Sequence, residues 1–386
     1  MEKIKVEEYK KSNSFFSFKK YNDPKEKKDV LNKIFKLSQD NRNFEIFNDY
    51  QRTIINLAIS DLKKDYEDPD VFNLKENSLA EILSLDSKDY LKYLFHRYRY
   101  EIFPLKKKID EYPPCLQIEP SSICNYRCIF CFETDTSFTN KKNGFMGTMN
   151  LDFFKKIIDQ AENNVEFITL ASRGEPLVSK KMQEMLEYTR NKFLNLKLNT
   201  NASLLTEKIC HSILSETVKT LVISADVADH EQYKKIRVNG DLSKVLKNLE
   251  MLNNIKEKHY RSSKIITRVS GVKFSTEQNF DEMINLWDGL VDQVAYVDYN
   301  PWENVYVAPS NNISKPCSDL WRRMFIWWDG KINPCDVDYK SSLSISSIEE
   351  KNLSESWNSE KYKNLRLQHL NSKRQSIKPC KSCALV

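Results

Sequence analysis

The stretch CNYRCIFC at residues 124–131 sets three cysteines close together, with the spacing C-x3-C-x2-C. Three thiolates can hold three corners of a cubane 4Fe-4S cluster, because such clusters are bound through cysteine sulfur, and the fourth iron then stays open. Zinc is the competing interpretation, but a structural zinc site needs four protein ligands, and no fourth Cys or His lies close by in the sequence. The spacing therefore favours an iron-sulfur cluster with one open iron.

The cysteine stretch follows an apolar run, CLQIE at 115–119, which is the first of six such runs. The others, which we expect to be strands, lie at 166–172, 196–200, 220–226, 265–272 and 293–299. Amphipathic stretches separate them and predict helices at 151–163, 178–192, 204–215, 229–257 and 276–288. Six such alternations predict an α/β fold in which parallel strands and crossover helices form an open or partial (β/α)6 barrel. The cysteines then lie at the C-terminal ends of the strands, where such folds collect their ligands.

The two flanks of this region have different patterns. Residues 1–110 contain helical periodicities and predict a helical N-terminal extension. Residues 311–386 contain four cysteines and a cluster of tryptophans, and they predict a small separate module. The barrel is therefore expected to occupy residues 111–310.

Composition limits the remaining functional classes. Lys and Arg outnumber Asp and Glu by 60 to 54, and the excess is spread along the chain, which does not indicate a nucleic-acid partner. The N-terminus lacks the pattern of an export signal and no run of about 18 apolar residues occurs, so we expect a cytoplasmic protein without a membrane partner. In a reducing cytosol, the nine cysteines are better explained by metal or cluster binding than by disulfides.

The stretch CNYRCIFC resembles the signature of the radical S-adenosylmethionine (SAM) superfamily. The resemblance implies that Cys124, Cys128 and Cys131 bind a 4Fe-4S cluster whose open iron holds the amino and carboxylate groups of SAM. An electron from the reduced cluster would then break the bond from sulfur to C5′ and release a radical that takes hydrogen from a substrate. A fourth cysteine would block that iron, so its omission serves the function.

Further stretches at strand ends are similar to motifs of the same superfamily. SRGEP at 172–176 resembles its G-G-E-P motif, except that Arg173 replaces the first glycine, and NTNAS, SAD and a downstream arginine follow in order. The resemblance implies that the glutamate receives the SAM ammonium group and that an aromatic residue of the cysteine stretch lies against the adenine. It also implies that a strand-four serine and the arginine bind the ribose and the SAM carboxylate. The SAM-binding residues implied in this way are Phe130, Gly174, Glu175, Pro176, Thr200, Asn201, Ser224 and Arg237.

The C-terminal cysteines have the spacing C-x17-C-x44-C-x2-C, whereas a zinc ribbon normally offers two close pairs. Their surroundings resemble the SPASM/twitch modules that follow many radical SAM domains. With four cysteines, the resemblance implies one auxiliary 4Fe-4S cluster whose irons are all bound by protein, and which can move electrons without binding substrate. The spacing is similar to that of twitch-type aminocyclitol dehydrogenases. The implied ligands are Cys317, Cys335, Cys380 and Cys383.

The resemblance implies an oxidoreductase that acts on a carbohydrate, nucleotide sugar or aminocyclitol. Hydrogen removal from a carbinol carbon leaves a radical that is oxidised easily once its hydroxyl proton departs, so a base is needed nearby. Arg268 is the candidate catalytic residue, and Asp336, Asp338 and Tyr339 are further polar candidates at the barrel mouth. We expect a sugar-like small molecule as substrate and a flavodoxin- or ferredoxin-type electron donor. The expected cofactors are SAM and two 4Fe-4S clusters.

Three alternatives remain open at this point. An epimerase would need a hydrogen donor after abstraction, and Cys115 and Cys210 are the only spare thiols. A maturase of ribosomally made peptides often has a leader-binding winged-helix domain, but residues 1–110 show no obvious strand pairs. A non-catalytic iron-sulfur electron carrier would leave the ordered motifs at the strand ends unexplained.

Overall fold

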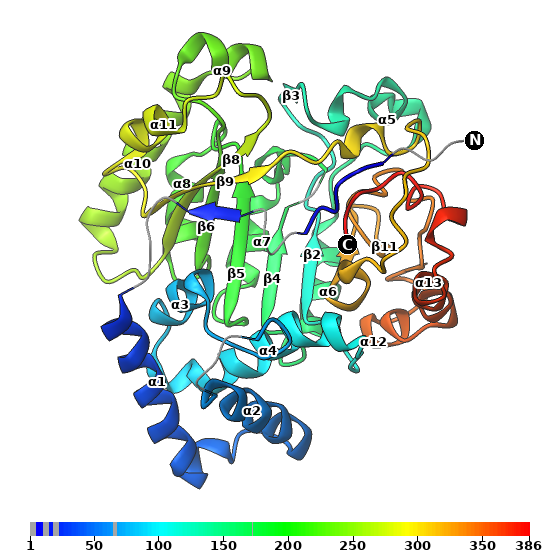
Figure 1. Ribbon diagram of the computed structural model, residues 1–386. Coiled ribbons are helices and arrows are strands. Elements are labelled where there is room, and N and C mark those ends of the chain that lie inside the picture. Colours follow the sequence, from blue (N-terminus) through cyan, green and yellow to red (C-terminus); the bar gives the residue numbers. More distant parts are fainter. Residues whose placement is uncertain (1–4, 11–14, 18–22, 65–67, 172) are drawn as a thin grey trace.

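The structure is a computed structural model and describes residues 5–10, 15–17, 23–64, 68–171 and 173–386. Its centre is a curved sheet of parallel strands with helices on its outer face (Figure 1). Residue 172, which ends one predicted strand and opens the stretch SRGEP, lies outside the described residues. The main strands are β2 (Cys115–Ile118), β4 (Phe167–Leu170), β5 (Asn195–Thr200), β6 (Thr220–Ser224), β8 (Ile266–Lys273) and β9 (Gln293–Asp298).

These six strands occupy the six predicted apolar runs and pair in parallel in the order of the sequence. The barrel does not close, because β2 pairs next with β10 and β9 pairs next with β1. The predicted α/β class and the partial barrel are thus confirmed.

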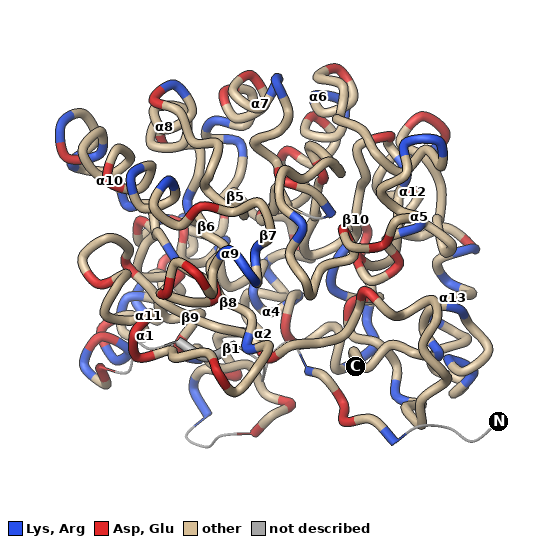
Figure 2. Tube along the Cα trace, turned by 90° about the horizontal axis from the view of Figure 1, so that it is seen from above, with Lys and Arg blue, Asp and Glu red and all other residues tan. Residues whose placement is uncertain are grey.

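Five crossover helices pack against the outer face of the sheet, and Figure 2 shows α10, α8, α7 and α6 of this set side by side, with residues of both charges along them. They are α6 (Leu151–Ala161), α7 (Met182–Tyr188), α8 (Glu207–Leu214), α10 (Leu242–His259) and α11 (Phe280–Trp287). Apolar side chains from both layers form the main core, for example Leu196 and Leu198 of β5. Asn150 caps α6 by accepting a hydrogen bond from the backbone N–H of Asp152.

The prediction of one helix over 229–257 is wrong. The structure has α9 (His230–Ile236), then β7 (Arg237–Val238), then α10. The chain leaves the helical conformation at Arg237, because β7 pairs with a strand inside the cysteine stretch, and Asn239, whose φ is 70°, follows β7 in the turn before α10. A long-range pairing therefore overrides the local helical periodicity.

The N-terminal region contains α1 (Pro24–Gln39), α2 (Asp49–Leu62), α3 (Glu76–Leu83) and α4 (Tyr90–Lys106). These helices form a second core that reaches Leu194 and Phe167, which lie at the N-terminal ends of β5 and β4. His96 of α4 stacks on Phe167 with 3.7 Å between the ring centroids. The helices therefore close the end of the barrel opposite the cysteine stretch.

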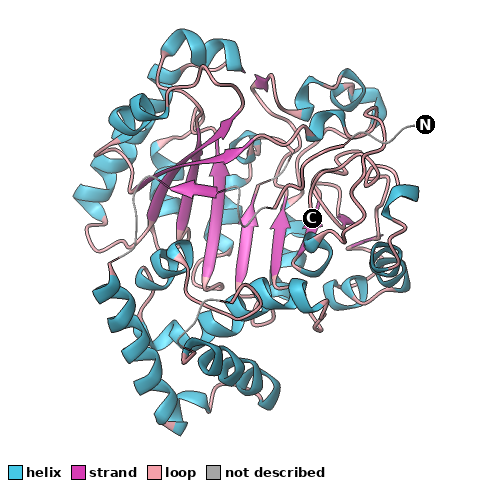
Figure 3. Cartoon of the chain, in the orientation of Figure 1, coloured by secondary structure: helices cyan, strands magenta, loops and turns pink. Residues whose placement is uncertain are grey.

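The C-terminal region extends the sheet. Strand β10 (Arg323–Ile326) pairs in parallel with β2, and β11 (Lys331–Asn333) and β12 (Ser346–Ser347) follow antiparallel. Helices α12 (Leu353–Trp357) and α13 (Glu360–Leu370) complete it, as Figure 3 shows by colour. The C-terminal module thus extends the barrel sheet beside β2, the strand that precedes the cysteine stretch.

The first described residues connect both edges of the molecule. The Tyr9 backbone exchanges hydrogen bonds with Ala384 and Val386, at 2.9 and 3.0 Å. Strand β1 (Phe15–Ser17) pairs antiparallel with β9. Among the described residues, no helix is both long and apolar enough to cross a membrane.

Candidate cluster and cofactor site

The cysteine stretch lies beyond the C-terminal end of β2 and is fixed by a short strand pair. Strand β3 (Arg127–Cys128) runs antiparallel to β7 and sets Cys128 opposite Arg237. The Nη1 atom of Arg237 lies 3.8 Å from the sulfur of Cys128. The Cys131 backbone N–H donates to the Cys128 carbonyl at 3.0 Å, which turns the loop so that Cys131 follows close behind.

The three thiols of this stretch share one enclosed environment. Burial raises the pKa of Cys124 to about 12 and also raises the pKa values of Cys128 and Cys131. The charges of the other two thiolates further raise the pKa of Cys131, so the three groups are neighbours. Thiols in such surroundings become thiolates when a metal neutralises them. The three side chains therefore fit a cluster that they can hold at three corners.

A single metal ion fits these residues less readily. In the part of the chain that the structure describes, no three Cys, His, Asp or Glu side chains converge as ligands of one ion. The cysteine sulfurs of a cubane bind different irons, so they stand further apart than the ligands of one zinc ion.

Gly174 marks the close approach of the loop after β4 to the cysteine loop. A Cβ atom at this position would lie 2.5 Å from the carbonyl carbon of Ser122 and 2.6 Å from the carbonyl oxygen of Ile123. The next residue, Glu175, donates its backbone N–H to that same Ile123 oxygen at 3.0 Å. Only glycine allows this approach, which brings Glu175 beside the cysteines.

Glu175 is buried and held by hydrogen bonds from the end of β5 and from its own loop. Its carboxylate accepts bonds from the Thr200 hydroxyl at 2.6 Å, the Asn201 backbone at 2.7 Å and the Leu177 backbone at 3.1 Å. Burial raises its pKa, and these donors and Arg237 lower it. Pro176 starts the 3-10 helix Pro176–Val178 that this carboxylate caps. The structure thus brings four predicted SAM-binding residues together.

A small polar network, which the sequence prediction missed, ties the cysteine loop to the end of β5. The Asn201 amide donates to Asn125 at 2.9 Å, and the Asn125 amide donates to the Ser203 hydroxyl at 2.9 Å. Asn125 lies between the first two cysteines of the signature, and Ser203 closes the quoted stretch NTNAS. The only sequence signal for these two residues was that they lie within the stretches CNYRCIFC and NTNAS.

Arg237 is oriented by Asp226, a second residue that the prediction left out of the site. Its Nε and Nη2 atoms donate to the two Asp226 carboxylate oxygens at 2.6 and 3.1 Å. Its guanidinium carbon lies 5.8 Å from the ring centroid of Phe130, which also contacts Phe274. Ser224, which ends β6, pairs with Ser270 of β8 at the same end of the sheet. The predicted residues Phe130, Ser224 and Arg237 therefore lie on the cysteine side.

Arg173, which replaces a glycine of the family motif, forms a buried link. It donates to Glu119 through Nε at 2.7 Å and Nη2 at 2.5 Å, and to the carbonyl of Tyr339 through Nη1 at 2.8 Å. Its guanidinium also lies over the ring of Trp327, 4.3 Å from the centroid. This residue therefore joins the barrel to the C-terminal module.

The remaining polar candidates lie in different places. Arg268 is in register with Val222 and Gln293 on the inner face of the sheet and donates to Gln293 at 2.6 Å. Asp338 accepts bonds from Tyr306 at 2.5 Å and from Ser342 at 2.6 Å within the C-terminal module. Asp336 and Tyr339 also belong to this module, where the Tyr339 hydroxyl donates to Asp135. Arg268 as a catalytic residue stays a prediction.

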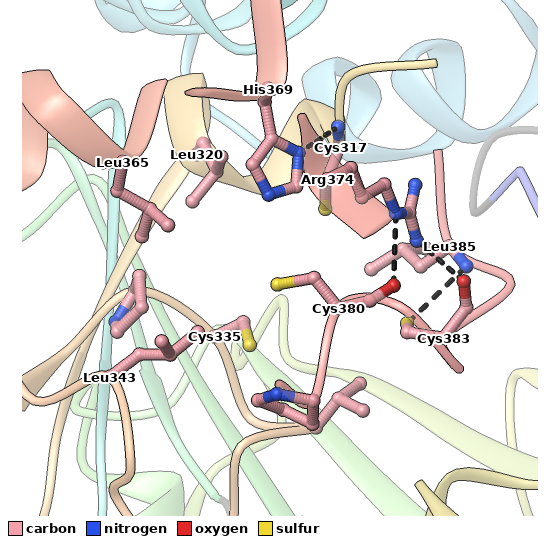
Figure 4. A pocket seen from close by; sticks show the side chains of 13 residues that line it. Cys317, Leu320, Cys335, Leu343, Leu365, His369, Arg374, Cys380, Cys383 and Leu385 are labelled. Carbon is pink, nitrogen blue, oxygen red and sulfur yellow. Dashed lines mark hydrogen bonds between the residues drawn. The ribbon is translucent and has the colours of Figure 1, made fainter. Parts of the chain in front are cut away.

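The four C-terminal cysteines line one pocket, and their sulfur atoms turn toward a common space (Figure 4). Leu320, Val337, Leu343 and Leu365 are among the walls of this pocket. Burial raises the pKa of the thiols, to about 12 for Cys317, and neighbouring thiols raise it further. Four buried thiols around one apolar space fit a cluster bound at every corner.

Two polar residues of this pocket were not predicted. Arg374 donates to the carbonyls of Cys380 at 3.1 Å and Cys383 at 2.6 Å, which fixes the last two ligands. The Cys317 backbone donates to His369 at 3.3 Å, and burial lowers the pKa of this His to about 3, so it accepts as a neutral ring. His369 lies 52 residues from Cys317, and Arg374 contacts backbone carbonyls, so neither contact follows from a sequence motif.

Two family models match the chain. The radical SAM superfamily model matches residues 118–286, and the model of the iron-sulfur cluster-binding SPASM domain matches residues 317–384. The match to the radical SAM model indicates that the chain binds SAM and a 4Fe-4S cluster. The match to the SPASM model indicates that it binds auxiliary iron-sulfur clusters.

Individual proteins resemble the chain at lower identity. A GTP 3′,8-cyclase of Clostridium botulinum (strain Okra / Type B1) is 24% identical over 218 residues, which cover 53% of this chain and 64% of that protein. The match thus spans less than two thirds of this curated relative.

Two solved structures resemble the fold. Streptococcus suis SuiB bound to precursor peptide SuiA has a TM-score of 0.54 at 18% identity and covers 92% of this chain and 86% of its own. BtrN in complex with AdoMet and 2-DOIA has a TM-score of 0.48 at 16% identity, over 72% of this chain and 94% of its own. The likeness to SuiB supports a shared overall fold.

Proposed function

We propose that this chain, which matches the radical SAM superfamily model and the SPASM domain model, is an enzyme that oxidises a sugar-like small molecule and passes an electron to the auxiliary cluster. One observation carries the proposal most. Cys317, Cys335, Cys380 and Cys383 surround one pocket, so a cluster there has a protein ligand at every corner. Such a cluster has no free iron for substrate, and electron transfer is the role left to it.

The cysteine stretch and the strand ends would hold the SAM cofactor. Cys124, Cys128 and Cys131 would bind the first cluster, and Glu175 would receive the SAM ammonium group. Arg237, oriented by Asp226, would face the SAM carboxylate or ribose. When bound, SAM and the reduced cluster supply a carbon radical that takes a hydrogen atom from substrate.

The positions of the spare thiols favour oxidation over epimerisation. Cys210 is fully buried on α8, which packs on the outer face of the sheet. Cys115 starts β2 at the end of the sheet opposite the cysteine stretch and is 5% exposed. An epimerase needs a hydrogen donor beside the substrate radical, and neither thiol lies on the cysteine side of the sheet.

Product mass tests the proposed function. The reconstituted enzyme is reduced without oxygen and given SAM with nucleotide sugars, phosphorylated sugars and aminocyclitols in turn. We expect 5′-deoxyadenosine to form together with a product that is two hydrogens lighter than the substrate. Solvent deuterium gained at one carbon would instead establish epimerisation, and a modified peptide from a precursor-peptide panel would establish maturation. Protein that never cleaves SAM under any of these conditions contradicts the enzymatic account.

A further inference from the structure

The inner face of the sheet carries many polar side chains, some of which are partly exposed. Along β5, Leu196 and Leu198 are buried against the helices, whereas Lys197 and Asn199 alternate with them and are partly exposed. Other inward side chains, such as Gln117, Thr169 and Gln293, are buried, so solvent reaches the concave side only at some of its positions. This face lies beneath the strand ends at which we place SAM.

Three cations occupy inward positions on this face. They are Lys197 of β5, Arg268 of β8 and Arg323 of β10. Arg268 donates to the Gln293 amide, and Arg323 donates to the Tyr100 hydroxyl at 3.1 Å. Among the described residues, Lys197 makes no hydrogen bond or ion pair through its ammonium group. Gln293 and Tyr100 are neutral partners, while the charge of Asp319 also acts on Arg323.

The inward positions of the described barrel strands and of β10 hold no Asp or Glu. Glu119 and Asp226, which follow β2 and β6, form ion pairs with Arg173 and Arg237. Glu81 of α3 lies further below and pairs with Arg97. These carboxylates are committed to other cations.

The cations also act on one another. Burial, then the charges of Arg323 and Arg268, lowers the pKa of Lys197 to about 8, while Cys115 and Glu81 raise it by smaller amounts. Burial is the larger cause of this shift, and repulsion between Lys197 and the two guanidinium groups adds to it. A negatively charged ligand would remove this repulsion.

We propose that Lys197 and Arg268, with Arg323 beside them, bind a phosphate or carboxylate group of the substrate on the inner face of the sheet. The proposal rests on the proposed function for its substrate. An ammonium point charge and a guanidinium fork are together suited to an oxyanion with several acceptor oxygens. Asn199 and Gln293, which share the Arg268 level of the sheet, add amide groups beside the cations.

The register gives the depth of this site. Arg268 pairs with Val222, two residues before Ser224, and Lys197 pairs with Thr220, four residues before it. At a strand rise of about 3.3 Å per residue, the cations lie roughly 7 and 13 Å below the level of Ser224. A phosphorylated or nucleotide-linked sugar can span this distance with its reacting carbon near SAM. A free aminocyclitol, which is a cation, would be repelled, so the inference narrows the substrate class.

Anaerobic calorimetric titration of the reconstituted protein with inorganic phosphate, and separately with succinate, tests the inference. We expect wild type to bind at least one of these anions at one site, and Lys197→Met and Arg268→Gln to weaken that binding at least tenfold. Lys208→Met removes the same charge from an exposed position of α8 and should bind like wild type. Tighter binding of phosphate indicates a phosphate group on the substrate, and tighter binding of succinate indicates a carboxylate.

Two further measurements separate a binding role from a structural one. Lys197→Arg keeps the charge and should retain binding, which distinguishes lost charge from lost folding. Wild-type affinity for the bound anion should fall as pH rises through about 8, where Lys197 loses its proton in the anion-free protein, and this fall should vanish in Lys197→Arg. The inference is overturned if neither anion binds wild type, or if Lys197→Met binds as wild type does. Cleavage of SAM by the same preparation is a separate readout, and its failure would contradict the proposed function alone.

Discussion

Gly174 and Arg173 are neighbours in the chain, but the sequence predicts the role of only one of them. Gly174 belongs to a motif, and the structure gives the physical reason, since any Cβ would overlap the backbone at Ser122 and Ile123. Arg173 departs from the motif, and its role appears only with its partners Glu119 and Tyr339, which lie far away in sequence. A motif thus predicts a residue, whereas a buried ion pair needs the fold.

Replacing Gly174 with Ala tests the close approach of the two loops. The added methyl group must push the Glu175 loop away from the cysteine loop, so we expect SAM binding to weaken at least tenfold in anaerobic calorimetry. Gly144→Ala is the control, because a Cβ there meets nothing within 4 Å, so any loss comes only from its φ of 73°. Equal SAM affinity in the Gly174 variant and the control would show that this contact does not position the cofactor.

Across the candidate site, residues that lie in motifs could be predicted, whereas residues that act through folded-state contacts could not. Cys124, Cys128, Cys131 and the predicted SAM-binding residues could be proposed from the sequence because they lie in short motifs after the strands, and the four C-terminal cysteines could be proposed from their spacing. Asp226 and Arg374 could not be, since each acts through a hydrogen bond to a group that the chain brings near only on folding. The cation group at Lys197 was also hidden, because a lysine in a strand reveals neither its inward direction nor its charged neighbours.

At the scale of elements, periodicity predicted the six parallel strands and failed where two distant segments pair. The two-residue strand β7 interrupts a helical pattern to meet β3, and such a short pairing leaves no trace in local hydrophobicity. The addition of β10 to β2 was missed for a similar reason, since RMFI lies in a region rich in tryptophan that reads as a separate module. Both pairings fix the cysteine stretch from its two sides.

The link between barrel and C-terminal module can be measured through Arg173. Its side chain and that of Glu119 are 2% and 0% exposed, and removal of one partner leaves a buried charge uncompensated. We expect Arg173→Met to lower the free energy of unfolding by about 3–5 kcal/mol in anaerobic urea titrations. Adding Glu119→Gln should recover part of this loss, because the unpaired charge is then removed.

An exposed ion pair provides the matched control for this variant. Lys181 pairs with Glu184 at 3.0 Å, but both side chains are largely exposed, so Lys181→Met should change stability by less than about 1 kcal/mol. A similar small effect for Arg173→Met would mean that the buried pair does not hold the two parts together.

At the scale of the whole molecule, the N-terminal helices cover one end of the barrel, and the cysteine stretch lies at the other end. The N-terminal helices reach Phe167 and Leu194 at the N-terminal ends of the strands, so these helices lie away from the cysteine stretch. Sequence periodicity predicted that region as helical but could not place it, because the surfaces that it covers belong to other segments. The assignment of residues 1–110, 111–310 and 311–386 as three domains stays a proposal.

The two clusters have different roles in this account, and the open corner of the first carries the chemistry. Cys124, Cys128 and Cys131 come from one loop at the barrel mouth, whereas the four C-terminal cysteines surround a pocket of their own. Replacement of Cys124, Cys128 and Cys131 should therefore remove about half of the bound iron and leave the auxiliary cluster in place. Loss of Cys380 and Cys383 should spare some uncoupled SAM cleavage.

The most direct test is the formation of 5′-deoxyadenosine by the variant in which Cys124, Cys128 and Cys131 are all replaced by Ala. The reduced, reconstituted variant is compared with wild type and with the variant lacking Cys380 and Cys383. The account predicts no cleavage of SAM in the first variant, with about half of the wild-type iron retained, and measurable cleavage in the second. Cleavage at the wild-type rate by the triple variant would contradict it.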